Sequence, residues 1–231
     1  MFTHQKDFGN DQTVATLHFR KSNESDMFFF NRYTLLLKNE QQTEPLKQTF
    51  YINKNQESIT LKEAYNLMNG RAIHKELTNK EGENFKAWLQ LDFKQTDKNG
   101  NYKLHPFNEK YGFDLKKSLE KHVIKEMADP EQQERLMQSL ERGNRQAISI
   151  IINGQERKIS IEAAPQFKSL NFYESNGQRI KADKLYESNT QGQSVKQDGK
   201  KQLKSQKDEE DSGPPQQQQQ KKSRKNRQSI T

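Results

Sequence analysis

Cysteine is absent from this chain of 231 residues. Its absence excludes disulfide bonds, zinc sites built on thiolates, and catalysis by a thiol nucleophile. A chain without cysteine is also compatible with a reducing compartment such as the cytoplasm, where disulfides are rare.

Long apolar runs are missing as well. The longest one, MFFFNRYTLLL at 27–37, is interrupted by Asn31 and Arg32, whereas a membrane-spanning helix needs about 20 predominantly apolar residues. The first residues, MFTHQKDFGNDQ, do not show the basic patch followed by an apolar stretch that marks a secretory signal. We therefore expect a soluble, unexported, cytoplasmic protein that does not enter a membrane.

The motifs of common catalytic and cofactor sites are missing too. The 11 glycines are isolated, so none forms the glycine cluster between a strand and a helix that binds a phosphate or a dinucleotide. No serine lies in a Gly-x-Ser-x-Gly turn. The acidic residues mostly alternate with Lys or Arg, as on a solvated surface. We expect neither an enzyme nor a cofactor-binding protein, and we assign no catalytic residue.

Metal binding is not expected either. The chain has five histidines: His4, His18, His74, His105 and His122. They are dispersed, and no two have the roughly three- to five-residue spacing of a helical metal site. The loop DKNGN at 97–101 is similar to a calcium loop, but its glycine is the fourth residue rather than the sixth. We interpret this loop as a hairpin turn.

The composition divides the chain into two parts. Only 29% of the residues are hydrophobic, and large apolar residues almost disappear after Lys181. Residues 181–231 hold 12 Lys or Arg and 7 Asp or Glu, a net charge of +5, and the remaining 27 and 24 give +3 for the rest. We expect an α+β domain over 10–181 and a disordered, basic, low-complexity tail over 182–231, because such a tail cannot bury enough apolar surface to offset its ordering entropy.

Signals for helix ends predict three helices, over residues 60–70, 114–123 and 129–143. The first begins with Thr60 and Glu63 spaced as in a capping box. The second and third begin at aspartates that can cap a helix, and the third ends at a glycine. The second helix is expected to bury three apolar residues: Leu115, Leu119 and Val123.

Apolar residues that alternate with polar ones predict strands around these helices. The strands are expected at 13–19, 27–37, 46–52, 85–93, 101–107, 147–152 and 157–163. Among them, 27–37 is expected to be the longer and more buried strand. The last two are joined by Asn153-Gly154, the best short hairpin signal in the chain. The predicted fold is therefore α+β, with antiparallel hairpins packed against three helices.

Two stretches are similar to each other. LMNGRAI at 67–73 and LERGNRQAI at 140–148 both run from a helix through Gly and Arg to Ala-Ile, and each is followed by strands with glycine-containing turns. The match predicts a two-copy helix-hairpin repeat, with two subdomains that meet near 110–130. The alternative is that the two stretches are unrelated and share only the residues that commonly occur where a helix ends and a hairpin begins.

The stretch APQFKSLNFYESNGQRIK at 164–181 interleaves apolar, aromatic and basic residues. A strand over 167–173 would place Lys168 on the side that also carries Leu and Phe, and Tyr173 on the other side. Aromatic rings stack on bases and cations hold phosphates, so Lys168 and Arg179 are candidate nucleic-acid-binding residues. The alternative is a core strand with one exposed lysine, because the glycines of the RNA-recognition signature are missing.

A basic run near the C-terminus is the second candidate for nucleic-acid binding. Its cations are Lys221, Lys222, Arg224, Lys225 and Arg227. Flexible basic tails neutralise phosphates without a folded surface. Two prolines and five glutamines separate this run from the acidic stretch 207–213, which limits self-neutralisation. The alternative is that the run is merely a solubilising end.

Three motifs carry a resemblance to a known family: Gly70-Arg71-Ala72 after the first helix, KNGNY at 98–102, and PQFK at 165–168 with Gln178-Arg179. In this order they resemble an uncharacterised domain of Bacteroidetes conjugative transposons and related mobile elements, over about residues 27–181. The family is a domain of unknown function, so the resemblance implies no catalytic or binding residue. It implies a cytoplasmic accessory protein of a mobile element, in a context of DNA transfer and processing.

These observations favour a noncatalytic accessory protein that contacts nucleic acid, DNA or RNA, mainly by electrostatics. The alternative is a protein–protein interaction module with no nucleic-acid role, whose partner is another protein of the mobile element. Its basis is the number of hairpin edges and the aromatic residues Phe28 to Phe30 and Trp88, which would be exposed and meet a partner strand. The other interpretation of these rings is that they are core residues.

Overall fold

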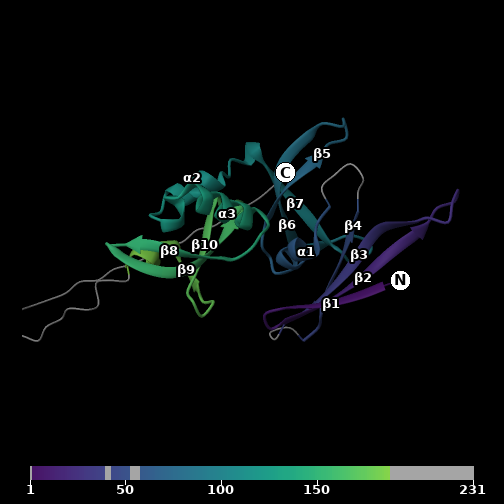
Figure 1. Ribbon diagram of the computed structural model, residues 1–231, viewed down its shortest axis with the longest axis horizontal. Helices are drawn as coiled ribbons and strands as arrows, with labels where there is room; N and C mark the ends of the chain where they lie inside the picture. Colours follow the sequence, from purple (N-terminus) through teal and green to yellow (C-terminus); the bar gives the residue numbers. More distant parts are fainter. Residues whose placement is uncertain (1, 40–42, 53–57, 188–231) are drawn as a thin grey trace, which may run out of the picture. The chain divides into compact units, whose positions relative to one another are not determined.

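The computed structural model describes residues 2–39, 43–52 and 58–187 of the protein (Figure 1). In this part of the chain, strands form three antiparallel sheets: β1-β2-β3-β4 (sheet A), β5-β6-β7 (sheet B) and β11-β10-β9-β8 (sheet C). The strands are β1 (Phe2–Phe8), β2 (Asp11–Lys21), β3 (Phe28–Lys38), β4 (Leu46–Tyr51), β5 (Ile73–Thr78), β6 (Asn84–Thr96), β7 (Tyr102–Asn108), β8 (Gln146–Ile152), β9 (Gln155–Ala164), β10 (Ser169–Tyr173) and β11 (Arg179–Ile180). The α-helices are α1 (Leu61–Met68), α2 (Leu115–Glu120), α3 (Pro130–Glu141) and α4 (Ala182–Glu187). The predicted α+β class with antiparallel hairpins is confirmed.

Sheet A and α1 share the first hydrophobic core. Alternate residues of β3, namely Tyr33, Leu35 and Leu37, are buried there with the apolar side of α1. The start of α1 is the predicted capping box: the Glu63 amide donates to Thr60 Oγ1 at 3.3 Å, and the Thr60 amide donates to the Glu63 carboxylate at 2.8 Å. The sequence therefore predicted both the position of this helix and its buried side.

The prediction that 27–37 is a buried strand is wrong for its first half. Phe28, Phe29 and Phe30 are exposed. They pair with the last residues of β2 only, because β1 ends its pairing opposite Leu17 and β4 ends opposite Arg32. Among the described residues, the tip of the β2–β3 hairpin is thus a two-stranded extension, and its aromatic side chains are accessible.

Sheet B has a hydrophobic core on each of its faces. Leu89 and Leu91 of β6 belong to the core that contains α1. Trp88, the residue between Ala87 and Leu89, belongs to a second core and pairs with Phe107 of β7. Neighbouring residues of a strand point to opposite faces, so one strand serves both cores. The expected exposure of Trp88 is therefore wrong, since only 5% of it is accessible.

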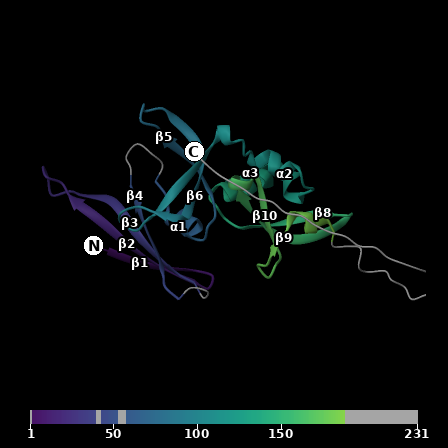
Figure 2. The ribbon, with the colours of Figure 1, turned by 180° about the vertical axis from the view of Figure 1, so that it is seen from behind.

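Sheet C and the helices α2 and α3 make up most of the second core. Figures 1 and 2 show both helices together over one face of this sheet. They begin at the predicted caps, where the carboxylates of Asp114 and Asp129 accept backbone amides at 3.0 and 2.8 Å. No helix in the described part of the chain is long and apolar enough to cross a membrane.

The second helix is shorter than predicted. It ends at Glu120, and the chain then turns, so Val123 leaves the apolar stripe and is 66% exposed. The expected burial of Val123 is wrong for this reason, whereas Leu115 and Leu119 are buried as predicted. Ile124 takes the place of Val123 in the core and forms an isolated β-bridge with Ile150.

The two similar stretches at 67–73 and 140–148 lie against each other. Asn66, at the start of this contact, donates from Nδ2 to the carbonyl of Arg142 at 2.6 Å and to Oδ1 of Asn144 at 3.0 Å. Each stretch follows a helix and leads into an antiparallel meander, as the repeat hypothesis predicts. Common ancestry of the two units and the two-subdomain interpretation remain hypotheses.

The described fold is larger at both ends than the predicted range of 10–181. At the start, β1 pairs with β2 over all seven of its residues. At the end, α4 follows, with Leu185 fully buried in the second core and the Tyr186 hydroxyl 2.5 Å from Nδ1 of His122. The boundary at 181 is too early because these two side chains find partners in the fold. Residues 188–231, most of the expected tail, lie outside the described residues.

The contact between His122 and α4 predicts a pH-dependent stability. His122 also packs against the ring of Phe172 at 5.0 Å, and burial, followed by the charge of Lys121, lowers the pKa of His122 below its ordinary value of 6.5. The unfolded chain then binds the extra proton first, so the free energy of unfolding should fall as the pH drops below about 6.5. Urea unfolding between pH 7.5 and 5.5 tests this; a His122→Gln variant should lose less stability over that range than the native chain, and an equal loss would contradict the assignment.

Candidate nucleic-acid interface

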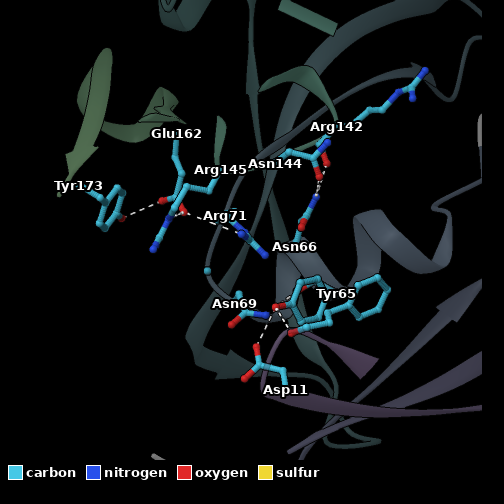
Figure 3. A network of polar contacts seen from close by, with 12 residues as sticks. Asp11, Tyr65, Asn66, Asn69, Arg71, Arg142, Asn144, Arg145, Glu162 and Tyr173 are labelled. Carbon is cyan, nitrogen blue, oxygen red and sulfur yellow. Dashed lines mark hydrogen bonds and ion pairs between the residues drawn. The ribbon is translucent and has the colours of Figure 1, made fainter. Parts of the chain in front are cut away.

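The face of sheet C opposite α2 and α3 carries polar side chains. Three polar side chains point to this face: Glu162 of β9, and Asn171 and Tyr173 of β10. Their sequence neighbours Ile161 and Phe172 point the other way, into the second core. The close-up in Figure 3 shows that side chains from distant parts of the chain converge here on Glu162. We call Arg71, Arg145, Glu162 and Tyr173 the arginine cluster.

Glu162 is the acceptor at the centre of the arginine cluster. Its Oε1 accepts from Nε of Arg145 at 2.8 Å, and its Oε2 accepts from the hydroxyl of Tyr173 at 2.7 Å. Nη1 of Arg71 lies 4.0 Å from Oε1, and the Glu162 side chain is only 6% exposed. A buried carboxylate is stable only when it is paired and hydrogen-bonded, and here two cations and a hydroxyl serve that purpose.

Arg145 and Tyr173 also contact each other directly. The guanidinium carbon of Arg145 lies 3.7 Å from the centre of the Tyr173 ring, a short cation–π contact. Burial first, and then the hydrogen bond to Glu162, raises the pKa of Tyr173 above its ordinary value. Tyr173 therefore stays protonated at neutral pH and keeps its role as a donor to Glu162.

Arg71 is the most enclosed cation of the cluster. Its side chain is 13% exposed, and its Nε and Nη2 atoms are buried without a hydrogen-bond partner among the described residues. The ring of Tyr65 lies 5.2 Å from its guanidinium carbon, and the Tyr65 hydroxyl donates to Asp11 at 2.8 Å. Glu162 of β9 and Tyr65 of α1 thus contact the Arg71 guanidinium from two different elements.

Arg179 lies on the same face, is exposed and, unlike Arg71 and Arg145, has no carboxylate partner among the described residues. Its Nη2 donates to Oδ1 of Asn171 at 2.6 Å. Arg179, Lys181 and the exposed ring of Phe167 line a surface hollow of about 460 Å³, together with Ser169, Leu170, Asn171 and Ile180. The lining therefore combines two cations, an amide and an exposed ring.

Lys168, the other candidate on this stretch, is not in a strand. Residues 165–167 form a single 3-10 turn, Lys168 closes it in the left-handed region with φ of 51°, and β10 begins only at Ser169. The predicted side-by-side arrangement with Leu and Phe is wrong for this reason. Its ammonium lies 5.0 Å from the centre of the Tyr111 ring instead, so the structure brings Arg179 but not Lys168 to the polar face.

The other candidate residues, Lys221, Lys222, Arg224, Lys225 and Arg227, lie outside the described residues. Within residues 2–39, 43–52 and 58–187, no group of three or more His, Asp or Glu side chains is arranged to hold a metal ion. The expected absence of metal, cofactor and enzymatic activity stays a prediction.

Sequence reasoning missed the centre of the arginine cluster. Glu162 carries a signal that was not used: it is the one charged residue in the run ISIEAA at 159–164, where a lone charge points to a buried ion pair. Arg71 and Arg145 were noticed as matching positions of the two similar stretches. Nothing in their local sequence shows that both reach the same carboxylate.

Comparison with known proteins does not extend these findings. No family model matches the chain, and neither a curated protein nor a solved structure matches it. The resemblance to a mobile-element domain therefore stays a hypothesis.

Proposed function

We propose that this protein is a noncatalytic accessory protein that binds single-stranded nucleic acid, DNA or RNA, through the hollow around Arg179. The observation that carries the proposal is the lining of that hollow, which has two cations, Arg179 and Lys181, and no carboxylate. Cations without a carboxylate partner attract phosphates. The ring of Phe167, which is 66% exposed at the rim of the hollow, is suited to stack on an unpaired base.

The neighbouring arginine cluster supports this interface by fixing its geometry. Arg145 lies next to the β10–β11 turn, where its Nη1 is 3.9 Å from the position of a Cβ on Gly177. This turn leads directly into Arg179. The basic run near the C-terminus adds five further cations, and the resemblance to a mobile-element domain favours, by analogy, a role beside DNA transfer.

The proposal is tested by the binding of a labelled single strand longer than about 16 nucleotides to the full chain, followed by fluorescence anisotropy. Arg179→Ala should weaken binding about tenfold, since one charge-assisted contact is worth about 1.5 kcal/mol. Phe167→Ala should weaken it by a similar factor, because the base loses its stacking partner. The matched control is Arg135→Ala, which removes the same charge from a 73% exposed position on α3 and should change the affinity less than about twofold.

Measuring the affinity at two salt concentrations distinguishes the contribution of the hollow from that of the basic run near the C-terminus. Replacing the five cations of that run by Gln should reduce the slope of log affinity against log salt by about 0.7 for each phosphate that is no longer neutralised. The Arg179 effect should persist in this background. Binding that is absent, insensitive to salt, or equally affected by Arg179→Ala and Arg135→Ala would contradict the proposed function.

A further inference from the structure

Sheet A carries a second, apolar surface that the proposed function does not use. Five aromatic rings follow one another on its inner face, the face that α1 covers in part: Phe2, Phe19, Phe30, Tyr33 and Phe50. Successive ring centres lie 5.7, 5.3, 6.3 and 5.3 Å apart. Tyr33 and Phe50 are buried, whereas Phe2, Phe19 and Phe30 are exposed. The apolar inner face therefore continues beyond the part that the fold covers.

A β-bulge directs these rings to one side. The pairing of β2 with β3 shifts between His18 and Phe19, so Asn31 has no pairing partner on β2. This extra residue puts Phe30 on the same face as Tyr33, although three positions separate them and strict alternation would place them on opposite faces. The local structure thus maintains an exposed aromatic strip that a regular hairpin would not have.

The strip leads into a groove of about 330 Å³ between sheet A and the start of α1. Its lining includes Leu17, Phe30, Ile52, Ile59 and Leu61. Tyr33 also lines it, but its hydroxyl donates to the Ile59 carbonyl at 2.7 Å, so the polar atom is already satisfied. Although His4, Ser58 and Thr60 also line it, the groove presents mainly carbon atoms to an occupant.

The edge strand β1 runs along this surface (Figure 1). Within the described residues it pairs with β2 only, so the backbone groups of its other edge lack strand partners. Phe2, His4 and Lys6 of β1 lie opposite Leu17, Ala15 and Thr13, and so they point to the inner face. Unprotected edges of this kind pair readily with an added strand.

The far end of β1 is basic. The ammonium groups of Lys6 and Lys62 lie 5.3 and 4.5 Å from the centre of the same ring, that of Phe8. Burial first, and then the charges of Arg71 and Lys6, lower the pKa of Lys62. On this face one carboxylate, that of Asp11, accepts the Tyr65 hydroxyl, whereas Asp7, between Lys6 and Phe8, points to the outer face. Arg71 is paired with Glu162, so Lys6 and Lys62 against the one carboxylate of Asp11 leave an excess of positive charge on the inner face at this end.

We propose that an extended segment of another protein adds to the free edge of β1 as a further strand of sheet A. Its large apolar side chains pack on Phe2 and into the groove, and its acidic side chains lie beside Lys6 and Lys62. An added strand has the same two-residue period as β1, so apolar and acidic residues at alternate positions match the order of Phe2, His4 and Lys6. The charge at the basic end selects an acidic partner.

Two other occupants fit the surface less well. A second copy of the chain would place β1 against β1, and antiparallel pairing about Gln5 would set Lys6 opposite His4 of the other copy, with like charge when the histidine is protonated. A membrane would have to bury the charged hairpin tip beside the exposed rings, where Glu24 and the ion pair of Lys21 with Asp26 lie. Charged side chains are costly to place inside a bilayer.

The test uses synthetic labelled peptides and the full-length protein. Each peptide has Thr at the outer positions and, at the alternate inner positions, Glu, Glu, Leu and Phe in that order for antiparallel pairing, or the reverse for parallel pairing. One of the two should bind saturably. Lys6→Glu should weaken this binding at least about tenfold, and Phe2→Ser should also weaken it. The matched control Lys47→Glu, an exposed lysine of β4 on the outer face, should leave it unchanged.

Two further experiments distinguish a loss of the contact from misfolding of the protein variants: a charge swap and backbone methylation of the peptide. A peptide with Lys in place of Glu should bind the Lys6→Glu protein better than the native protein. N-methyl groups on the peptide edge that faces β1 should abolish binding, while the same groups on the other edge should not. The proposal is wrong if neither peptide binds, if methylation of either edge has the same effect, if the chain forms a dimer that Lys6→Glu dissociates, or if phosphatidylcholine–phosphatidylserine vesicles bind and compete with the peptide.

Discussion

Replacing Gly143 by alanine is expected to lower the free energy of unfolding by about 3 kcal/mol, which combines the cost of a left-handed backbone with that of overpacking. Gly143 has φ of +76°, and a Cβ at this position would lie 2.8 Å from the Ala72 carbonyl oxygen and 2.9 Å from Cγ2 of Ile73. The oxygen belongs to the backbone and cannot move aside cheaply. Urea unfolding of the native and variant proteins measures the effect.

Gly154 provides the matched control for this substitution. Its φ of +78° is nearly the same, but nothing lies within 4 Å of the position of its Cβ. Gly154→Ala should therefore cost only the backbone term, about 1 kcal/mol. If the two variants are equally destabilised, the stretches 67–73 and 140–148 do not pack closely enough at Gly143 to exclude a Cβ, and this contact does not contribute to stability.

The ends of the helices could be predicted because their chemistry is local. Thr60 with Glu63, Asp114 and Asp129 each satisfy backbone amides within three residues, so the sequence itself contains both partners. The alternating patterns likewise placed most of the strands. Helix caps and strand alternation depend only on residues that are close in sequence, so a sequence pattern contains all the information needed to predict them.

The errors arise where burial depends on elements far away in the chain. Phe28 and Trp88 are both aromatic residues in strands, yet 64% of Phe28 is exposed and Trp88 is buried. The difference is that β1 and β4 end before Phe28, whereas Trp88 faces a complete second core. No feature of the residues beside them encodes this, because the length of a neighbouring strand decides it.

The candidate site shows the same division. Arg179 was predicted from the mixture of aromatic and basic residues in its own stretch, and the structure places it on an accessible face. Glu162 was missed because its partners Arg71 and Arg145 lie 91 and 17 positions away in sequence, and they meet it only through the packing of two cores. A site assembled by tertiary contacts leaves only an indirect trace in sequence, here a single acidic residue in an apolar strand.

Replacing Glu162 by glutamine is expected to lower the free energy of unfolding by about 3 kcal/mol, because removing one partner of a buried ion pair leaves the other charge uncompensated. The amide keeps the shape of the side chain and still accepts the Tyr173 hydroxyl, so the loss reports on charge. Chemical unfolding at neutral pH measures it. The control is Glu174→Gln, which breaks the ion pair with Arg157, both 33% exposed, and should cost less than about 1 kcal/mol.

A double-mutant cycle shows which of the two arginines is destabilised when Glu162 loses its charge. Arg145 is 37% exposed and can be hydrated when its partner is removed, whereas Arg71 is enclosed and already has two nitrogens without a hydrogen-bond partner among the described residues. Arg71→Met in the Glu162→Gln background should therefore restore about 1 kcal/mol or more, since an apolar side chain of similar length needs no counter-charge. If Arg71→Met instead adds its own loss to that of Glu162→Gln, the two side chains are not coupled, and the buried charge of Arg71 is stabilised by Tyr65 rather than by Glu162.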